Sequence, residues 1–93
     1  MAEQKRLYKI HVSGRVQGVG FRWSAVHQAQ SLGITGLVRN LSDGRVYIEA
    51  EGSERQLDAF LQWCHKGPGW GLVESVTFVS SALSHYRDFR IDY

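Results

Sequence analysis

The sequence predicts an α+β fold in which two helices cover one face of a mostly antiparallel sheet. Segments with the alternating pattern of half-buried strands are interrupted by two segments whose apolar residues recur at helical spacing. A chain of 93 residues is long enough for one domain with a single two-layer core. We therefore expect residues 1–93 to form one domain.

The composition indicates a soluble, folded protein. Hydrophobic residues make up 43% of the chain, charged residues 22%, and there is one proline. The net charge of +2 is too small for a protein that binds nucleic acid through bulk charge. The single cysteine, Cys64, excludes an internal disulfide and fits a reducing compartment. No secretory signal or membrane-length apolar run is evident, so we expect a cytoplasmic protein without a membrane partner. The small size and the absence of a coiled-coil pattern favour a monomer, and the mild charge argues against a nucleic-acid partner.

The first half of the chain predicts a strand, a helix and a hairpin. Residues 7–13 alternate between apolar and polar side chains, as in a half-buried strand. Residues 21–32 change to helical spacing. Residues 35–41 and 45–51 are strand-like again, and the turn-forming residues 42–44 lie between them.

The second half predicts another helix and the remaining strands. Residues 53–56, with the sequence Ser-Glu-Arg-Gln, match a capping box that begins a helix, and the Gly-Pro-Gly segment 67–69 ends it. Its apolar stripe is formed by Leu57, Phe60, Leu61 and Cys64. Residues 72–80 and 89–93 are strand-like. This order of elements predicts a ferredoxin-like α/β sandwich (βαββαβ) with a short C-terminal strand.

This topology brings distant segments together at one edge of the sheet. The third strand lies between the first two, which are therefore about 10 Å apart, or two strand spacings. The end of the first strand, the start of the first helix and the end of the second strand meet there. We therefore expect the segment 14–20, Arg22 and Asn40 to converge.

The segment 14–22, Gly-Arg-Val-Gln-Gly-Val-Gly-Phe-Arg, has the composition of an anion-binding loop. Its three glycines allow backbone N–H groups to turn inward, and the following helix adds unpaired N–H groups and the positive end of its dipole. Arg22 carries a planar, two-pronged donor that suits a phosphate. The segment alone also fits a glycine-rich turn with two solvated arginines.

Asn40 is the second candidate residue at this edge. Its amide carries both a donor and an acceptor, so it could hold a water molecule whose lone pair points at a phosphorus atom. The alternative is local, because an asparagine near a hairpin turn often bonds its own backbone. The residue alone favours the local interpretation, and the topology favours the other.

Two motifs resemble the acylphosphatase family: the segment 14–22 and the segment 36–46, Gly-Leu-Val-Arg-Asn-Leu-Ser-Asp-Gly-Arg-Val. Residues 66–68 and 89–93 are similar to that family as well. The resemblance implies an enzyme that hydrolyses small acyl phosphates to a carboxylate and inorganic phosphate, without metal or other cofactor. It implies that Asn40 positions the attacking water and that a phosphoryl oxygen takes the water's proton. The phosphate, as substrate or as inhibitory product, would be held by Arg22 and the backbone amides of Arg15, Val16, Gln17, Gly18, Val19 and Gly20.

The chain departs from the family pattern at residues 69–72, Gly-Trp-Gly-Leu, where many members carry a small residue followed by arginine. We expect Trp70 to alter the rim that meets the acyl group, and not the chemistry. The other tryptophans, Trp23 and Trp63, are expected to be packing or rim residues.

Other phosphate-binding classes fit the sequence less well. The Walker pattern fails because Val19 stands where its second glycine would be, and the dinucleotide fingerprint fails because Trp23 replaces a glycine. A cysteine phosphatase needs its thiolate in the anion loop, whereas Cys64 lies in an apolar stripe. Metal-ligand spacing is absent among the histidines His11, His27, His65 and His85.

The remaining alternative is a non-catalytic phosphate- or RNA-binding module of the same fold. Residues 17–24 superficially match an RNA-recognition signature. Its base-stacking aromatics would fall on Val19 and Ser24, and the segment follows the first strand instead of lying on the third. The presence of both Arg22 and Asn40 favours the enzyme.

Overall fold

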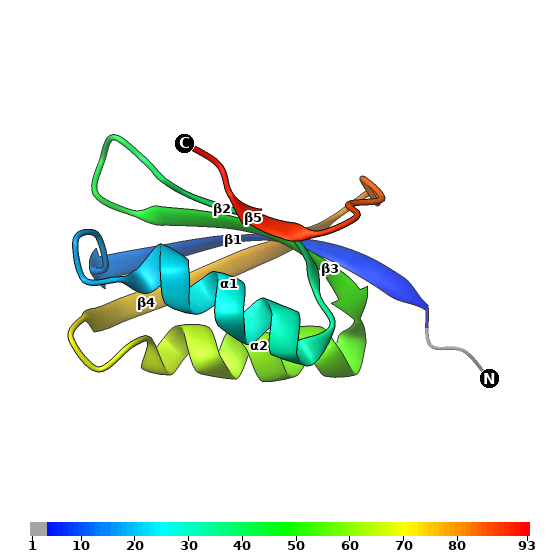
Figure 1. The fold of residues 1–93 in the computed structure, drawn as a ribbon, viewed down its shortest axis with the longest axis horizontal. Helices are drawn as coiled ribbons and strands as arrows, with labels where there is room; N and C mark the ends of the chain where they lie inside the picture. Colours follow the sequence, from blue (N-terminus) through cyan, green and yellow to red (C-terminus); the bar gives the residue numbers. More distant parts are fainter. Residues whose placement is uncertain (1–3) are drawn as a thin grey trace.

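The computed structural model describes residues 4–93 as a five-stranded sheet with two helices against one face (Figure 1). Residues 1–3, which belong to the expected domain, lie outside the described part. The elements are β1 (Lys5–Arg15), α1 (Phe21–Leu32), β2 (Thr35–Asn40), β3 (Val46–Ser53), α2 (Glu54–Lys66), β4 (Leu72–Ser81) and β5 (Phe89–Ile91). The predicted ferredoxin-like α+β fold is confirmed.

The sheet has the strand order β4-β1-β3-β2-β5. The predicted position of β3 between β1 and β2 is therefore confirmed. All neighbours are antiparallel except β2 and β5, which run parallel. Val12 on β1 and Asn40 on β2 both pair with Val46, so these two residues lie at the same level on opposite sides of β3.

Helix α1 has the predicted bounds, but strand ends differ from the prediction by a few residues. The largest difference is β1, which continues through Arg15 and so includes the first two residues of the expected anion loop. Strand β3 extends to Ser53, and β5 stops at Ile91. Strand ends are hard to predict because small and polar residues near a turn can either continue the strand pairing or belong to the loop.

Gly14 has a different role from the one expected. It lies in β1 at a shift of register against β4, with φ of 124°. A Cβ atom on Gly14 would lie 2.2 Å from the carbonyl oxygen of Leu72. This glycine therefore permits a close approach of two strands at a bulge, and the loop itself begins after Arg15.

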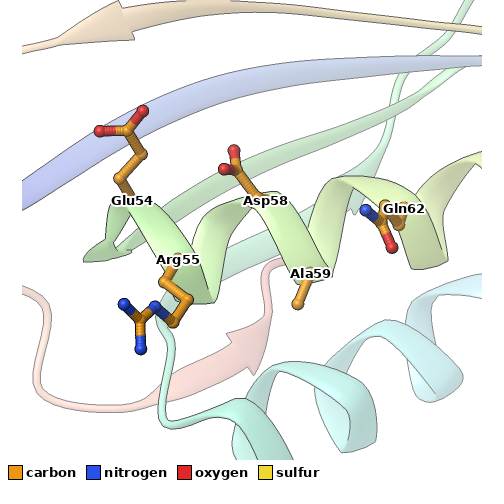
Figure 2. Close-up of a pocket in the computed structure, with 5 residues that line it drawn as sticks. All are labelled: Glu54, Arg55, Asp58, Ala59 and Gln62. Carbon is orange, nitrogen blue, oxygen red and sulfur yellow. The ribbon is translucent and has the colours of Figure 1, made fainter.

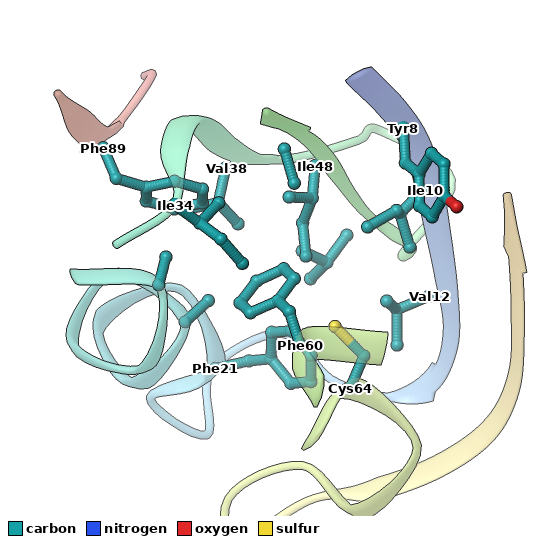
Figure 3. Packing of buried hydrophobic residues seen from close by; sticks show 14 of the residues in the cluster. Tyr8, Ile10, Val12, Phe21, Ile34, Val38, Ile48, Phe60, Cys64 and Phe89 are labelled. Carbon is teal, nitrogen blue, oxygen red and sulfur yellow. The ribbon is translucent and has the colours of Figure 1, made fainter. Parts of the chain in front are cut away.

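The core lies between the sheet and the two helices (Figure 3). Phe21 from α1 and Phe60 from α2 are completely or almost completely buried there, and Trp63 packs against both rings at 5.2 and 5.9 Å between centroids. Cys64 is fully buried in the same cluster, and burial raises the pKa of its thiol. The interpretation of Cys64 as a core residue is thus confirmed, because its environment disfavours the reactive thiolate.

The two helices begin in different ways. Ser53 ends β3 and caps α2: its Oγ accepts a hydrogen bond from the backbone N–H of Gln56 at 3.2 Å. The Gln56 side-chain oxygen accepts one from the N–H of Ser53 at 2.8 Å, which completes the predicted capping box. Helix α1 instead has Gly20 at its N-cap, in the left-handed region, with no side-chain cap. None of the described helices is long and apolar enough to cross a membrane.

Candidate active site

Arg22, Asn40 and part of the loop 16–20 line one small pocket of about 120 Å³. Arg22 comes from the first turn of α1, Asn40 is the last residue of β2, and the loop connects β1 to α1. The pocket, called the α1 pocket below, is lined by Val16, Gly18, Gly20, Phe21, Arg22, Trp23, Asn40 and Ile91. Of the predicted convergence of the segment 14–20, Arg22 and Asn40, the structure brings Val16, Gly18 and Gly20 together with Arg22 and Asn40, whereas Gly14 and Arg15 belong to β1.

The loop 16–20 is fixed by its own side chains. Val16 is 1% exposed and belongs to the core, and Val19 packs against the same core. Gly18 and Gly20 have φ of 74° and 79°, a region that side chains rarely allow. Both valines therefore anchor the loop to the core beside the pocket.

Gln17 points away from the α1 pocket. Its side-chain amide donates hydrogen bonds to the carbonyl oxygens of Leu41 at 2.7 Å and Arg45 at 2.9 Å. Those residues lie in the turn between β2 and β3, and Figure 1 shows this turn at the same end of the molecule as the loop. Only the backbone N–H of Gln17 is therefore a candidate for holding an anion.

The start of α1 is electropositive and uncapped by side chains. Its first turn contains no acidic residue, whereas α2 has Glu54 in its first turn and Ser53 as its cap. The first N–H groups of a helix have no partner within the helix, and the positive end of its dipole lies there. Since Gly20, Phe21 and Arg22 line the α1 pocket, this positive end borders it.

Asn40 carries a buried acceptor without a hydrogen-bond partner. Within the described part of the chain, its Oδ1 is the buried side-chain polar atom for which no partner is found. The local interpretation, in which the side chain bonds nearby backbone, is wrong for this oxygen. A buried acceptor left unpaired costs about 1–3 kcal/mol, so this position is destabilising unless something in the pocket pairs with it.

Arg22 keeps its charge available. None of the ion pairs among residues 4–93 involves it. Its guanidinium instead lies over the ring of Tyr93, with 5.5 Å from Cζ to the ring centroid. A carboxylate beside Arg22 would neutralise the cation, whereas an aromatic ring does not.

The rim of the α1 pocket carries Trp23, not Trp70. Trp23 is 64% exposed, lines the pocket and contacts the His27 ring at 4.1 Å between centroids. Trp70 is 83% exposed but does not line the pocket. Arg15, at the end of β1, does not line it either. Trp23, and not Trp70 as expected, therefore forms part of the rim of the α1 pocket.

A larger hollow of about 490 Å³ lies on the outer face of α2 (Figure 2). It is lined by Glu54, Arg55, Asp58, Ala59 and Gln62. All five residues belong to one helix, and none of the predicted site residues is among them. We therefore assign the candidate site to the smaller pocket, where separate elements converge.

The fold and the α1 pocket define a small ferredoxin-like domain with a glycine-rich, basic site at the edge of its sheet. The acylphosphatase family model matches residues 8–91. An acylphosphatase from Marinobacter nauticus is 50% identical over 84 residues, which cover 89% of this chain and 91% of that protein. An acylphosphatase from Archaeoglobus fulgidus is 46% identical over 85 residues, covering 91% and 96%.

The solved structures agree with the sequences. The crystal structure of acylphosphatase from Bacillus subtilis superposes with a TM-score of 0.92 at 38% identity, covering 95% of this chain and 99% of that one. The chain belongs to the acylphosphatase family.

Proposed function

We propose that this chain hydrolyses acyl phosphates in the α1 pocket, by in-line attack of a water molecule that Asn40 positions. The reaction breaks the bond between phosphorus and the carboxyl oxygen and releases a carboxylate and inorganic phosphate. Family membership supports the reaction. The observation that carries the assignment of roles is the unpaired, buried Oδ1 of Asn40 in the same pocket as Arg22.

The phosphoryl group would be held by Arg22 and the backbone amides of residues 15–20, of which Val16, Gly18 and Gly20 line the pocket. A guanidinium can donate two parallel hydrogen bonds to phosphate oxygens. The uncapped start of α1 adds N–H donors and a positive dipole end. The shape of the loop supports this role, because Val16 and Val19 anchor it while its glycines leave the backbone uncovered. Donors fixed in advance stabilise the charge that develops in the transition state.

Asn40 would orient the nucleophile. Its Oδ1 accepts a hydrogen bond from water, which leaves a lone pair of the water oxygen free to face phosphorus. Holding that water in line with the leaving oxygen supplies much of the catalysis in phosphoryl transfer. An acceptor that the protein leaves unpaired is suited to this task, since no internal bond must break first.

The proton balance needs no general base from the protein. The water oxygen bonds to phosphorus, the bond to the carboxyl oxygen breaks, and one water proton passes to a phosphoryl oxygen. A dianionic acyl phosphate and water thus give a carboxylate and dihydrogen phosphate. The leaving carboxylate is stable, so no strong acid is required to protonate it. This fits a pocket whose lining contains no carboxylate, imidazole or thiol side chain among the described residues.

The same donor set supports a reaction without metal or other cofactor. Groups of at least three metal-ligating side chains are not found among the residues described. We also propose that residues 1–93 act as one domain, as a cytoplasmic monomer whose partners are small acyl phosphates and inorganic phosphate and not nucleic acids. The net charge of +2 supports the last point.

The test is phosphate release from acetyl phosphate, with a phosphate monoester assayed alongside and with a chelator in a parallel sample. We expect hydrolysis of the acyl phosphate only, unchanged by chelation. The same assay is applied to Arg22→Ala, which removes the proposed phosphate-binding side chain. Arg87→Ala is its control, because it removes one positive charge at a residue that follows β4 and does not line the α1 pocket. RNA binding at moderate salt without hydrolysis would favour the non-catalytic module instead.

A further inference from the structure

We propose that Gln17 is a positioning residue that sets where Asn40 stands relative to the loop 16–20. The proposal rests on the proposed function of Asn40. It extends that function to a side chain that lies outside the α1 pocket and would touch neither water nor phosphate.

Gln17 connects two segments that the sheet keeps apart. The loop 16–20 follows β1, the turn 41–45 follows β2, and β3 lies between those strands. The Gln17 amide spans this gap with its bonds to the carbonyls of Leu41 and Arg45, 24 and 28 positions away. An amide nitrogen carries two hydrogens, and both are used here.

The turn 41–45 is a preformed block. The N–H of Leu41 donates to the carbonyl of Arg45 at 2.8 Å, and the N–H of Gly44 donates to the carbonyl of Leu41 at 3.2 Å. Asp43 accepts hydrogen bonds from the backbone N–H of Arg45 at 3.0 Å and from its Nε at 2.8 Å. Because these bonds are internal to the turn, they fix its shape. The pairing of Asn40 with Val46 fixes the base of the turn in the sheet, and the Gln17 bonds tie the turn to the loop 16–20.

The turn adjusts the position of Asn40 within the limits that the sheet sets. Asn40 pairs with Val46 as the last residue of β2 and directly precedes Leu41, so a shift of Leu41 is transmitted to its backbone. The Oδ1 of Asn40 has no hydrogen bond of its own to hold it in place. A displacement of about 1 Å at a reacting group can lower the rate about 100-fold. Gln17 therefore acts on the step in which Asn40 aims the water.

Phosphate binding should depend much less on Gln17. The proposed contacts come from Arg22 and the loop amides, and the loop keeps Val16 in the core whether or not Gln17 bonds to the turn. If Gln17 had only a structural role, replacing it would lower the stability of the fold and leave the turnover of the folded enzyme unchanged. Positioning instead predicts a lower kcat with an unchanged affinity for phosphate.

The experiment is a double-mutant cycle between Gln17→Met and Asn40→Ala. Methionine keeps the length of the side chain but has no hydrogen to donate. We expect Gln17→Met to lower kcat by about 10- to 100-fold, with the inhibition constant of inorganic phosphate changed by less than about threefold. In the Asn40→Ala background the same change should alter kcat little, because the group that Gln17 positions is gone.

Gln62→Met is the matched control, since it makes the same chemical change on the outer face of α2 (Figure 2). It should alter neither constant. If Gln17→Met does not fold, Gln17→Ala removes the same two bonds without placing an apolar chain between loop and turn. All rates are measured below the unfolding transition of each variant.

Three results would overturn the proposal. The first is a wild-type kcat in both folded Gln17 variants, and the second is an equal loss of kcat with and without Asn40. The third is a loss of phosphate affinity as large as the loss of kcat, which would make Gln17 part of the anion site. In these cases the role of Asn40 still stands. Full activity of Asn40→Ala alone would instead refute the proposed function itself, and this proposal with it.

Discussion

The Cζ atom of Arg22 lies 5.5 Å from the centroid of the Tyr93 ring. Tyr93 is 96% exposed, so water competes for this contact, and such exposed cation–π pairs are worth about 0.5–1 kcal/mol. The ring therefore restrains Arg22 weakly and leaves its charge intact. A phosphoryl dianion can recruit this guanidinium without displacing a carboxylate.

Arg22→Ala is expected to lower both turnover and phosphate affinity. Losing one preorganised donor costs about 100- to 1,000-fold in rate, and Arg22 supplies the charged side chain of the α1 pocket. Arg22→Lys should recover little, because an ammonium group cannot form the same planar fork. Steady-state rates and phosphate inhibition of both variants test this. Near-normal activity of Arg22→Lys would mean that positive charge alone suffices.

Asn40→Ala is expected to lower kcat strongly without weakening the fold. No partner for its Oδ1 is found among the described residues, so removing the side-chain amide breaks no protein hydrogen bond at that oxygen and should leave the unfolding midpoint nearly unchanged. Inorganic phosphate should still inhibit with similar affinity, since a neutral amide contributes little to binding a dianion. Calorimetry measures the unfolding midpoint of the variant, and inhibition kinetics measure its affinity for phosphate. A variant that binds phosphate as poorly as Arg22→Ala would place Asn40 in the anion site instead.

The fold was predictable because its signals are local. The apolar spacing of residues 21–32 and the capping box at Ser53 and Gln56 specify helix starts and lengths without reference to the rest of the chain. The order of elements then fixed which strand ends meet. The convergence of Arg22 and Asn40 in one pocket followed from that topology.

The features that were missed depend on contacts between distant segments. By sequence, Gly14 is the first residue of the glycine-rich motif 14–22. In the structure it lies at a bulge of β1 next to Leu72. The Gln17 side chain reaches across β3 to Leu41 and Arg45, a contact that no local pattern encodes. Trp70 was expected at the rim but does not line the pocket, because a residue's place along a loop does not tell which way it faces; Trp23, on α1, lies there.

Trp23→Ala is expected to affect substrates with bulky apolar acyl groups more than small ones. With the phosphoryl group held at Arg22 and Asn40 as proposed, the acyl group would extend toward the exposed Trp23 indole, which contacts the His27 ring. The KM of benzoyl phosphate should rise about 10-fold, as for a lost aromatic contact of about 1 kcal/mol or more, while that of acetyl phosphate changes little. Measuring the KM of both substrates tests this prediction.

Trp70→Ala is the matched control, since Trp70 is exposed but does not line the pocket. Equal effects of Trp23→Ala on both substrates would show that the indole does not contact the acyl group.

Glu51 anchors the segment between β4 and β5, away from the active site. Its carboxylate accepts hydrogen bonds from the backbone N–H groups of Ser84, His85 and Tyr86 at 2.5, 2.9 and 2.7 Å. His85 has φ of 60°, an uncommon conformation for a residue other than glycine, and these bonds hold it. Burial alone would raise the pKa of Glu51, but the three N–H donors outweigh it and hold this pKa below the usual value of 4.5.

The expected pH dependence follows from the sign of this shift. A carboxyl group whose pKa is lower in the folded state stabilises the fold fully above its unfolded pKa, and that stabilisation is lost as pH falls through the folded pKa. Glu51→Gln replaces one acceptor oxygen with an NH₂ group and leaves at least one N–H of the segment 84–86 unpaired. At neutral pH this should lower the free energy of unfolding by about 1–3 kcal/mol.

Chemical denaturation of wild type and Glu51→Gln from pH 7 to pH 3 tests the prediction. The difference in unfolding free energy should be constant near neutrality and shrink as pH falls below the usual carboxyl range, because the wild type then becomes protonated at Glu51. Glu74→Gln is the matched control, since it makes the same chemical change at an exposed position on β4. Turnover of acetyl phosphate at pH 7 should be the same in all three proteins, because Glu51 does not line the α1 pocket. A difference that persists undiminished at pH 3 would mean that the Glu51 charge contributes nothing and that shape alone holds the segment.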